Sequence, residues 1–546
     1  MTDYLSQPSS AHILGLGLGL GVFAFAALFI LDFISSQKYL QDVAVVGRGR
    51  GFINRLKDGR DYMWNYRAWM IDGHNRYNKK GLPFIAPGPL TRKPEIILPQ
   101  SQLAWMFDQP DHIISAQEAR YDMTYPQYNF LGHRLAFDQF GFRVVYKSLA
   151  RHLPTALPEI DQEIQQAAGR ALGNDTENWK TANLMGFWMS IVPYVTNRLL
   201  VGPELCREKK FLDEMVGFAT ATAINIALLN QIPKFFHPIF GRILAIRNWR
   251  HWRNASEQVL PLIRERLHAM TRQAAGDAEY KDYTPHEDFL TWLIRLAIAE
   301  ERTFELDPIV ISKRLLPIEF ASIHTTVLTG QLWTLDLLAS DPQTGILDTL
   351  REELRAHRPE SRAWDKVSLS SLVRLDSSIR ESMRYSNFSV TPVKRLVITK
   401  EGVHNPDLGM TFPRGTILVA NLQGIHHDAD IFENSDAYDP LRYSREREAW
   451  DRKSDDEKQS DPAEGARVRG FGSVTTSDTH LTFSHGRHAC PGRFFVAYEL
   501  KLIMAYLLLN YDIKLVGEPL EKKFLGAGIV PPVRASMQIR RKKAAA

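Results

Sequence analysis

A single cysteine in a glycine-flanked loop is the side chain best suited to do chemistry in this sequence. Cys490 lies between Gly486 and Gly492, and a strongly apolar helical stretch follows at once. A thiolate near the start of a helix is stabilised by unpaired backbone N–H groups and by the positive end of the helix dipole. The glycines let the backbone pass close to a large, flat group. Since one sulfur cannot complete a tetrahedral zinc site, the loop predicts an axial thiolate ligand for haem iron.

Two other interpretations of Cys490 stay open at this point. A free cysteine is most often a small buried core residue. A zinc site is the second alternative, and it would draw on His485, His488 and Cys490, three candidate ligands crowded into six residues. In either case the loop would hold no haem.

The order Phe-x-x-Gly-x-basic-x-Cys-x-Gly resembles the haem-binding loop of the cytochrome P450 superfamily. Phe483, Gly486, His488, Cys490 and Gly492 stand at its fixed positions. The resemblance implies a haem b cofactor with Cys490 as the axial iron ligand, and a mainly α fold with small β-sheets (α+β). The chain departs at His488, where many members carry an arginine beside a haem propionate. Because histidine titrates near neutrality, we expect His488 to be a weaker, pH-dependent partner.

A Glu-x-x-Arg pair on a helix upstream of the cysteine is the second fixed feature of the family. The chain offers Glu352 with Arg355 and Glu381 with Arg384, and a spacing of three places each pair on one helix face. Only the second pair precedes the strand-like segment and a Tyr-Asp-Pro-Leu-Arg442 string, which resembles the family's aromatic-x-Pro-x-Arg element. The resemblance implies a structural, charge-assisted network of Glu381, Arg384 and Arg442 behind the haem. Glu352 and Arg355 are expected on a solvated helix face.

Three basic residues are candidates for binding the haem propionates. Arg395 matches the position from which family members commonly reach a propionate, and a guanidinium suits a carboxylate well. A surface arginine on a strand is the alternative. Arg143 and Lys147 are further candidates, from a helix that matches the family's haem-flanking one, although the tryptophan often found there is absent.

The stretch from Ala321 to Thr326 resembles the oxygen-binding groove on the family's long central helix. Thr325 falls on the conserved threonine, and His324 replaces the usual carboxylate, as in fungal members. Ser322 replaces a glycine. A serine hydroxyl can also perturb a helix, by donating a hydrogen bond to the backbone carbonyl one turn earlier. Imidazole can relay protons at neutral pH, so we expect Thr325 and His324 to act in catalysis. A histidine satisfied inside the helix is the alternative.

Composition sets limits on the class of protein. The chain has 546 residues and 44% hydrophobic residues, which is ample for a large core. Its net charge of +5 is the small difference between 67 basic and 62 acidic residues spread along the chain, so nucleic-acid binding is not indicated. The two cysteines exclude a disulfide framework and fit a reducing compartment.

The N-terminus has the length and composition of a membrane anchor. The apolar run over residues 13–34 is long enough to cross a bilayer. A cleaved signal peptide is the alternative, but residues 1–12 contain none of the Lys or Arg residues with which such a peptide begins. Basic residues follow the span, so the positive-inside tendency places the bulk of the protein in the cytosol. We expect a lumenal tail (1–12), a transmembrane helix (13–34), a basic linker (35–60) and a catalytic domain (61–546), in a single-pass protein of the endoplasmic reticulum membrane.

Within that domain, residues from about 100 to 350 have a mostly helical pattern, and strand-like runs appear from about 390 onward. Residues 445–478 are polar, charge-mixed and without periodicity, and they are predicted to be an exposed insertion. The segment over residues 231–240 contains two prolines and five large apolar residues. It is either a packed loop or a loop that dips into the membrane surface.

The resemblance implies a monooxygenase that activates dioxygen with electrons from an NADPH-dependent flavoprotein reductase. The segments expected to line the substrate site are mostly apolar or aromatic, so we expect a lipophilic substrate, such as a terpenoid, a steroid or another fungal secondary metabolite. These segments are residues 121–130, 235–236, 318–326, 387–391 and 524–530. Desaturation or rearrangement on the same fold, a haem-thiolate sensor without turnover, and a membrane-anchored scaffold without haem are the alternatives.

Overall fold

The computed structural model describes residues 40–89, 91–359, 363–518 and 521–543, together with residues 19, 21, 23, 24, 26–28, 30 and 31. The predicted lumenal tail (1–12) and much of the predicted anchor (13–34) lie outside the described residues. The nine described residues of the anchor segment are helical.

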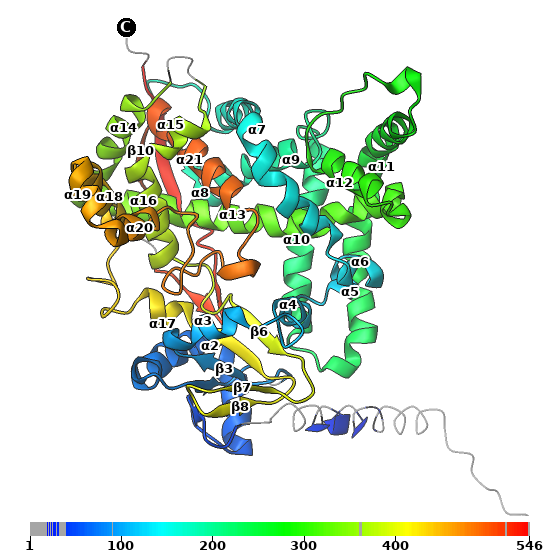
Figure 1. Cartoon of the computed structure of the whole chain (residues 1–546), viewed down its shortest axis with the longest axis vertical. Coiled ribbons are helices and arrows are strands. Elements are labelled where there is room, and N and C mark those ends of the chain that lie inside the picture. Colours follow the sequence, from blue (N-terminus) through cyan, green and yellow to red (C-terminus); the bar gives the residue numbers. More distant parts are fainter. Residues whose placement is uncertain are drawn as a thin grey trace, which may run out of the picture.

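The protein is mainly helical with small sheets, as predicted. Figure 1 shows helix α13 crossing the middle of the molecule, with a sheet and α2 at the opposite end from the C-terminus. The long helices are α2 (Phe52–Arg76), α7 (Phe140–Leu172), α10 (Lys209–Leu229), α11 (His237–Ala274), α13 (Pro308–Thr344) and α21 (Arg493–Asn510). Shorter ones include α3 (Leu103–Asp108), α4 (Ala116–Thr124), α5 (Pro126–Asn129), α8 (Leu184–Met189), α9 (Val192–Leu200), α12 (Phe289–Ala299), α14 (Ile346–Ala356), α16 (Val373–Tyr385) and α17 (Leu422–His426).

The largest core lies where α7, α9, α13 and α21 pack together. Trp188 of α8 and Trp333 of α13 are among the largest fully buried side chains. Gly330 permits the close approach of α8, since a Cβ there would lie 2.6 Å from the Trp188 ring. The Trp188 indole N–H donates to Thr334 Oγ1 at 3.1 Å, so this large side chain is both packed and satisfied. The core therefore holds α13 firmly from one side.

The main sheet is assembled from distant parts of the chain. Its strand order is β1-β2-β3-β9-β6-β4. The strands are β1 (Ala44–Val45), β2 (Phe84–Ala86), β3 (Glu95–Leu98), β9 (Ile417–Ala420), β6 (Lys394–Val397) and β4 (Ile114–Ser115). Strand β3 pairs in parallel with β9, and β6 pairs antiparallel with β9. A second sheet joins β5 (Lys180–Asn183), β13 (Ser536–Arg541) and β10 (Tyr511–Leu515). The main sheet fixes the position of Arg395 on β6.

The predicted basic linker (35–60) is partly wrong, because the folded domain begins near residue 40 rather than at 61. Val43 and Val46 are buried, β1 pairs with β2, and α2 starts at Phe52. The arginines in this stretch have partners; for example, Arg48 Nη1 donates to Asp58 Oδ1 of α2 at 2.9 Å. The apolar residues between the arginines therefore join the sheet, and acidic residues of α2 compensate the charge.

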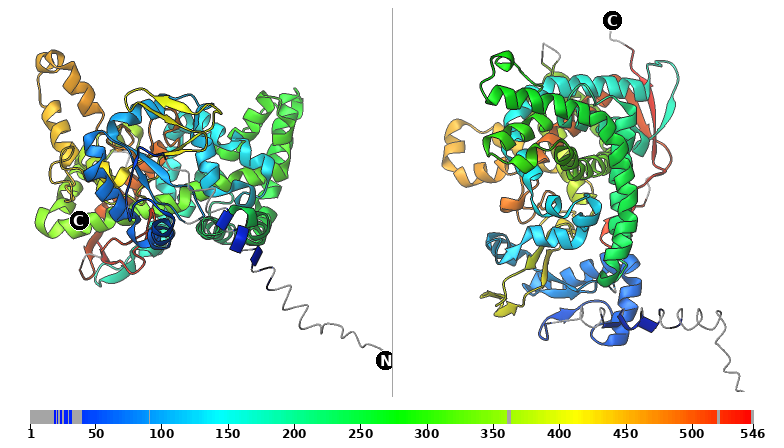
Figure 2. Two further views of the ribbon diagram at one scale, coloured as in Figure 1. Left: turned by 90° about the horizontal axis from the view of Figure 1, so that it is seen from below. Right: turned by 90° about the vertical axis from the view of Figure 1, so that its right-hand side faces the viewer.

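The segment 445–478 is largely exposed but helical, which the sequence pattern did not predict. It contains most of α18 (Arg442–Asp451), then α19 (Asp455–Ser460) and α20 (Pro462–Arg469). These helices project from the body in Figure 2. Local capping explains them, because Ser454 forms a capping box with Glu457, and Asp461 accepts from the backbone N–H of Glu464. Helix caps depend on a few adjacent residues, so these short helices show no long apolar periodicity in the sequence.

Among the described residues, one helix is long and apolar enough to cross a membrane by length and composition. It is α10, and nearly half of its apolar window is buried against the rest of the protein. Packing against α11 and α13 accounts for this composition.

A buried carboxyl group on α13 makes stability depend on pH. Glu319 is fully buried, Asn197 Nδ2 donates to it at 3.4 Å, and burial raises its pKa to about 8. Between the unfolded pKa near 4.5 and about 8, the folded state holds a proton that the unfolded chain releases. Stability is therefore lost as pH rises through this window.

Glu319→Gln is expected to remove this loss and to raise the free energy of unfolding at pH 7 by about 1 to 3 kcal/mol. Denaturant unfolding at pH 6 and pH 8 measures it. Glu352→Gln, on the exposed face of α14, is the matched control and should keep the wild-type pH dependence. A Glu319→Gln variant with the wild-type slope would contradict this account.

Candidate active site

The Cys490 loop is a tight turn that leads into α21. The Cys490 backbone N–H donates to the Phe483 carbonyl at 2.8 Å, and the half-buried Phe483 ring packs against the main core. Gly486 has a φ of +68°, a conformation that favours glycine. At Gly492 a Cβ would meet only the Cys490 sulfur, at 3.8 Å. Both glycines therefore keep this side of the loop flat and open.

The Cys490 side chain is partly accessible, although protein surrounds it on most sides. This burial raises the pKa of the thiol, while the backbone N–H of Gly492 and the Arg493 guanidinium act to lower it. The N–H groups at the start of α21 are thus directed at the sulfur, as expected for a residue that must carry negative charge.

The two histidines of the loop have other partners. His488 Nε2 lies 2.6 Å from Asp111 Oδ1, and burial lowers the pKa of His488. His485 Nδ1 lies 2.9 Å from Thr476 Oγ1, and its ring packs edge-on against Phe107. Across the part of the chain that the structure describes, no group of three or more His, Cys, Asp or Glu side chains could hold a metal ion. The zinc interpretation is therefore wrong.

Positive charge gathers beside the loop and, among the described residues, exceeds the negative charge of Asp111. Arg120 of α4, Arg395 and Arg487 are close enough to influence one another, and the nearby carboxylate of Asp111 is paired with His488. Burial, and then the charge of Arg120, lower the pKa of Arg395 to about 10. Burial also lowers the pKa of Arg120. A cluster of this kind favours a ligand with two carboxylates.

These residues fit a haem. The Cys490 sulfur would bind the iron, the two loop glycines would leave room for a flat ring, and Arg120 and Arg395 would neutralise the propionates. Arg120 was missed in the sequence because it belongs to no motif and comes near Cys490 only through the fold. Arg487 is held in place by its donation to three backbone carbonyls, those of residues 107–109.

Arg143 and Lys147 are paired elsewhere in this structure, which gives no support to the prediction that they bind a propionate. Arg143 forms an ion pair with Glu300, and Lys147 Nζ lies 3.0 Å from the same carboxylate. Both basic side chains are about half exposed, and Glu300 compensates them at the surface of α7.

Replacing both Arg120 and Arg395 with glutamine is expected to lower haem retention severalfold, because buried propionates would lose their counter-charges. The ratio of haem to protein after gel filtration measures this. Arg143→Gln, which removes an arginine of the surface ion pair, is the control and should keep full haem content. Equal haem ratios in all three proteins would remove the arginines from the site.

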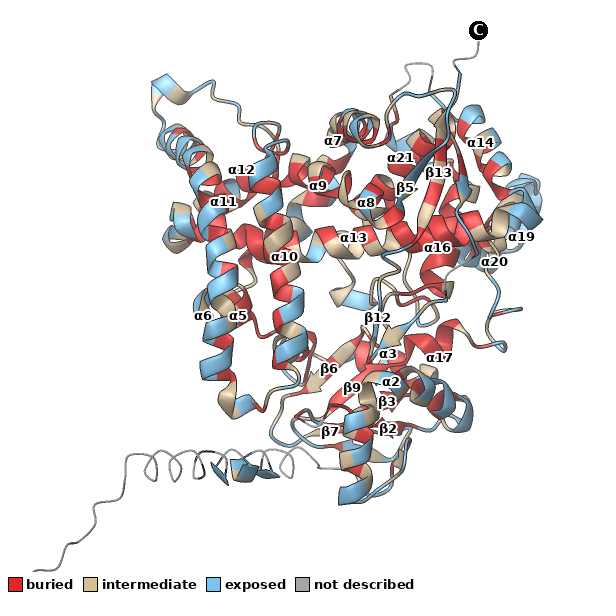
Figure 3. Cartoon of the chain, turned by 180° about the vertical axis from the view of Figure 1, so that it is seen from behind, coloured by how far each residue is buried: buried red, intermediate tan, exposed pale blue. Residues whose placement is uncertain are grey.

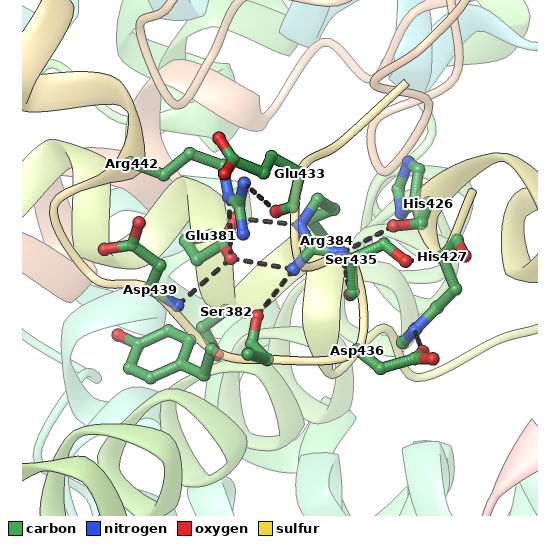
Figure 4. A network of polar contacts seen from close by, with 12 residues as sticks. Glu381, Ser382, Arg384, His426, His427, Glu433, Ser435, Asp436, Asp439 and Arg442 are labelled. Carbon is green, nitrogen blue, oxygen red and sulfur yellow. Dashed lines mark hydrogen bonds and ion pairs between the residues drawn. The ribbon is translucent and has the colours of Figure 1, made fainter. Parts of the chain in front are cut away.

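The structure brings Glu381, Arg384 and Arg442 together in a buried network (Figure 4). Arg384 donates to both oxygens of Glu381, at 2.8 and 2.7 Å, and Arg442 Nε donates to Glu381 Oε1 at 3.0 Å. Arg384 also donates to the backbone carbonyls of His426, Ser435 and Ala437. The network ties α16 to the loop ahead of α18. Glu352 and Arg355 are exposed, as predicted.

The predicted oxygen groove lies on an open face of α13. Ala321 is exposed and Thr325 is half-buried, whereas Ile323 and Thr326 are buried. Ser322 Oγ donates to the Ile318 carbonyl at 2.6 Å, and Thr325 Oγ1 donates to the Ala321 carbonyl at 2.7 Å. Backward bonds of this kind weaken and bend a helix locally.

His324 is not satisfied within its own helix. Its Nε2 lies 3.1 Å from Thr220 Oγ1 of α10, and burial lowers its pKa, so the imidazole is neutral near pH 7. No sequence motif identifies Thr220 as the partner of His324, since α10 meets α13 only in the folded protein.

Comparison with known proteins agrees with this geometry. The family model for Cytochrome P450 matches residues 158–538. Cytochrome P450 monooxygenase gloP of Glarea lozoyensis is 29% identical over 489 residues, covering 88% of this chain and 87% of the relative. Cytochrome P450 monooxygenase htyF of Aspergillus rugulosus is 31% identical over 467 residues, covering 84% of this chain and 66% of the relative.

A solved structure, retinoic acid bound cyanobacterial CYP120A1, is similar with a TM-score of 0.60 and 16% identity, covering 88% of this chain and 97% of that chain. At this identity the likeness shows the fold alone. The family match and the curated relatives carry the assignment further, and together with the thiolate loop they show that the chain belongs to the cytochrome P450 family and is a monooxygenase.

Proposed function

We propose that this monooxygenase binds haem b through Cys490 and oxidises a lipophilic small molecule at the endoplasmic reticulum membrane, with electrons from an NADPH-dependent flavoprotein reductase. The observation that carries the proposal is the meeting of one thiol, two loop glycines and two neighbouring arginines at a single site. When bound, the haem supplies the activation of dioxygen.

The chain's own residues have separate roles in this proposal. Cys490 holds the iron, and Arg120 and Arg395 bind the propionates. Thr325 and His324 hold and move protons at the open face of α13, since a hydroxyl and a neutral imidazole can pass a proton in either direction. Glu381, Arg384 and Arg442 keep the loop region rigid.

An aromatic cluster supports a lipophilic substrate. Phe130, which follows α5, has its ring centroid 5.9 Å from that of Phe320 on α13 and 6.4 Å from that of Phe218 on α10. Phe130 and Phe320 belong to two of the segments expected around the substrate, and Phe218 adds α10 to them. We propose a terpenoid, a steroid or another secondary metabolite, which is in keeping with the fungal origin of the similar monooxygenases.

Exposed apolar side chains on α10 and α11 support attachment to a bilayer beside the N-terminal anchor. Figure 3 shows exposed residues along both helices. The apolar ones are Ile224, Leu228, Ile239, Phe240, Ile243, Ile246 and Trp249. Between the helices lies the turn η3 (Lys234–Phe236), none of whose residues is buried. A surface of this kind suits a membrane interface, with the catalytic domain on the cytosolic side.

Two measurements test the proposal. The reduced, carbon-monoxide-bound protein should show the red-shifted Soret band of thiolate ligation, and a panel of lipophilic compounds should include some that shift the ferric spin state. Those compounds should also stimulate NADPH oxidation and yield oxidised products when a flavoprotein reductase is present. A missing red shift would overturn haem-thiolate binding. Spin-state shifts without any NADPH oxidation would favour a ligand sensor instead.

A further inference from the structure

The hydrogen-bonding state of His324 can be read from its neighbour on α10. The Thr220 hydroxyl lies 2.9 Å from the Val216 carbonyl, to which it donates, and 3.1 Å from His324 Nε2. A hydroxyl has one hydrogen to give, so toward His324 the Thr220 oxygen is the acceptor. Nε2 of His324 therefore carries the proton, and Nδ1 carries the lone pair.

The other nitrogen of His324 has no partner. Nδ1 is buried, and no hydrogen-bond donor of the described chain reaches it. An acceptor in this state costs free energy unless a water molecule or another group bonds to it. His324 thus offers one unfilled acceptor one residue away from Thr325.

The position of Thr220 is fixed by contacts that neighbouring residues of α10 make with α11. A Cβ on Gly217 would lie 2.5 Å from the ring of His251 on α11, so only glycine lets that ring lie against the helix. One turn away, His251 Nδ1 lies 2.7 Å from Glu214 Oε2. The same helix carries Phe218 into the aromatic cluster with Phe130. Helix α10 is therefore held between α11 and the expected substrate space.

We propose that Thr220 is a positioning residue, which holds His324 as the neutral Nε2–H tautomer and leaves Nδ1 as the acceptor for a water molecule in the proton route to Thr325. The proton route rests on the proposed function, whereas the tautomer of His324 is assigned independently of it. Thr220 and Phe218 both lie on α10. A shift of this helix would therefore move both the expected substrate space and the hydrogen-bond partner of His324.

The test compares Thr220→Val, which keeps the shape and removes the hydroxyl, with Thr220→Ser, which keeps the hydroxyl. Thr271→Val is the matched control, because Thr271 bonds back to the Leu267 carbonyl in the same way but on α11. Imidazole nitrogen shifts are read by ¹⁵N NMR on the full-length, reduced, carbon-monoxide-bound protein, with His324→Gln to assign the signals. Product formed per NADPH consumed is measured separately.

Wild type, Thr220→Ser and Thr271→Val should all show His324 as Nε2–H. Thr220→Val should show a mixed or reversed tautomer, and at least a threefold lower yield of product per NADPH. An Nδ1–H tautomer in the wild type, or unchanged shifts in Thr220→Val, would overturn the inference. If the shifts behave as expected but no compound supports NADPH oxidation in the wild type, the proposed function fails and the tautomer assignment stands.

Discussion

Replacing Cys490 with serine is expected to abolish the red-shifted Soret band of the reduced, carbon-monoxide-bound protein, together with all monooxygenase activity. A serine hydroxyl at this position is a far weaker anionic ligand, and the loop offers no other soft donor, since His485 and His488 are bonded elsewhere. Absorbance spectroscopy of purified protein, with haem content determined in parallel, measures the effect.

The second cysteine supplies the control. Cys206 is fully buried, and burial raises the pKa of its thiol to about 11, so it is an inert core residue. Cys206→Ser should leave the band in place. A thiolate spectrum that survives Cys490→Ser and disappears in Cys206→Ser would show that the ligand had been assigned to the wrong cysteine.

Removing Arg384 is expected to destabilise the protein by about 3 to 5 kcal/mol, because it leaves the fully buried carboxylate of Glu381 without its bidentate partner. Three backbone carbonyls would lose a donor at the same time. Arg384→Met should therefore lose haem during purification and unfold at lower denaturant concentration, as measured by tryptophan fluorescence.

Two variants separate the network from a general effect of removing charge. Arg355→Met changes the other Glu-x-x-Arg pair, which is exposed, and should behave as wild type. The double variant Glu381→Met with Arg384→Met should be less destabilised than Arg384→Met alone, since neither member of the fully buried pair is left without the other. Equal losses in Arg384→Met and Arg355→Met would show that the buried network adds nothing.

The residues that the sequence predicted well are those held at fixed spacing by one local element. Cys490 and its glycines belong to one turn, and Glu381 and Arg384 lie three residues apart on one helix. Arg442 was found through its neighbouring tyrosine and proline, which stand beside it in the chain. In these cases a short string of residues already contains the geometry.

The residues that were missed or misplaced depend on contacts between distant segments. Arg120 comes near Cys490 only when α4 packs beside the loop, and Thr220 meets His324 only when α10 crosses α13. Arg143 forms an ion pair with Glu300, which lies far along the chain and of which the sequence gives no sign. Such pairs are set by tertiary packing, which a single sequence does not encode as a pattern.

The same reasoning applies to the start of the domain. A run of arginines suggested a flexible linker, but Arg48 finds Asp58 on the next helix, and Val43 and Val46 become buried. Charge pattern alone cannot separate a solvated arginine from one that is paired after folding.

The parallel pairing of β3 with β9 has a consequence for synthesis of the protein. The inner edge of β3 (Glu95–Leu98) finds its neighbour only after Ile417–Ala420 has left the ribosome, and β5 waits even longer for β13. At ordinary elongation rates this interval is on the order of tens of seconds. During it, the buried apolar residues of β2 and β3 present an unpaired strand edge, the kind of surface on which nascent chains aggregate. Shielding by chaperones should therefore matter most between translation of the first strands and of the ninth.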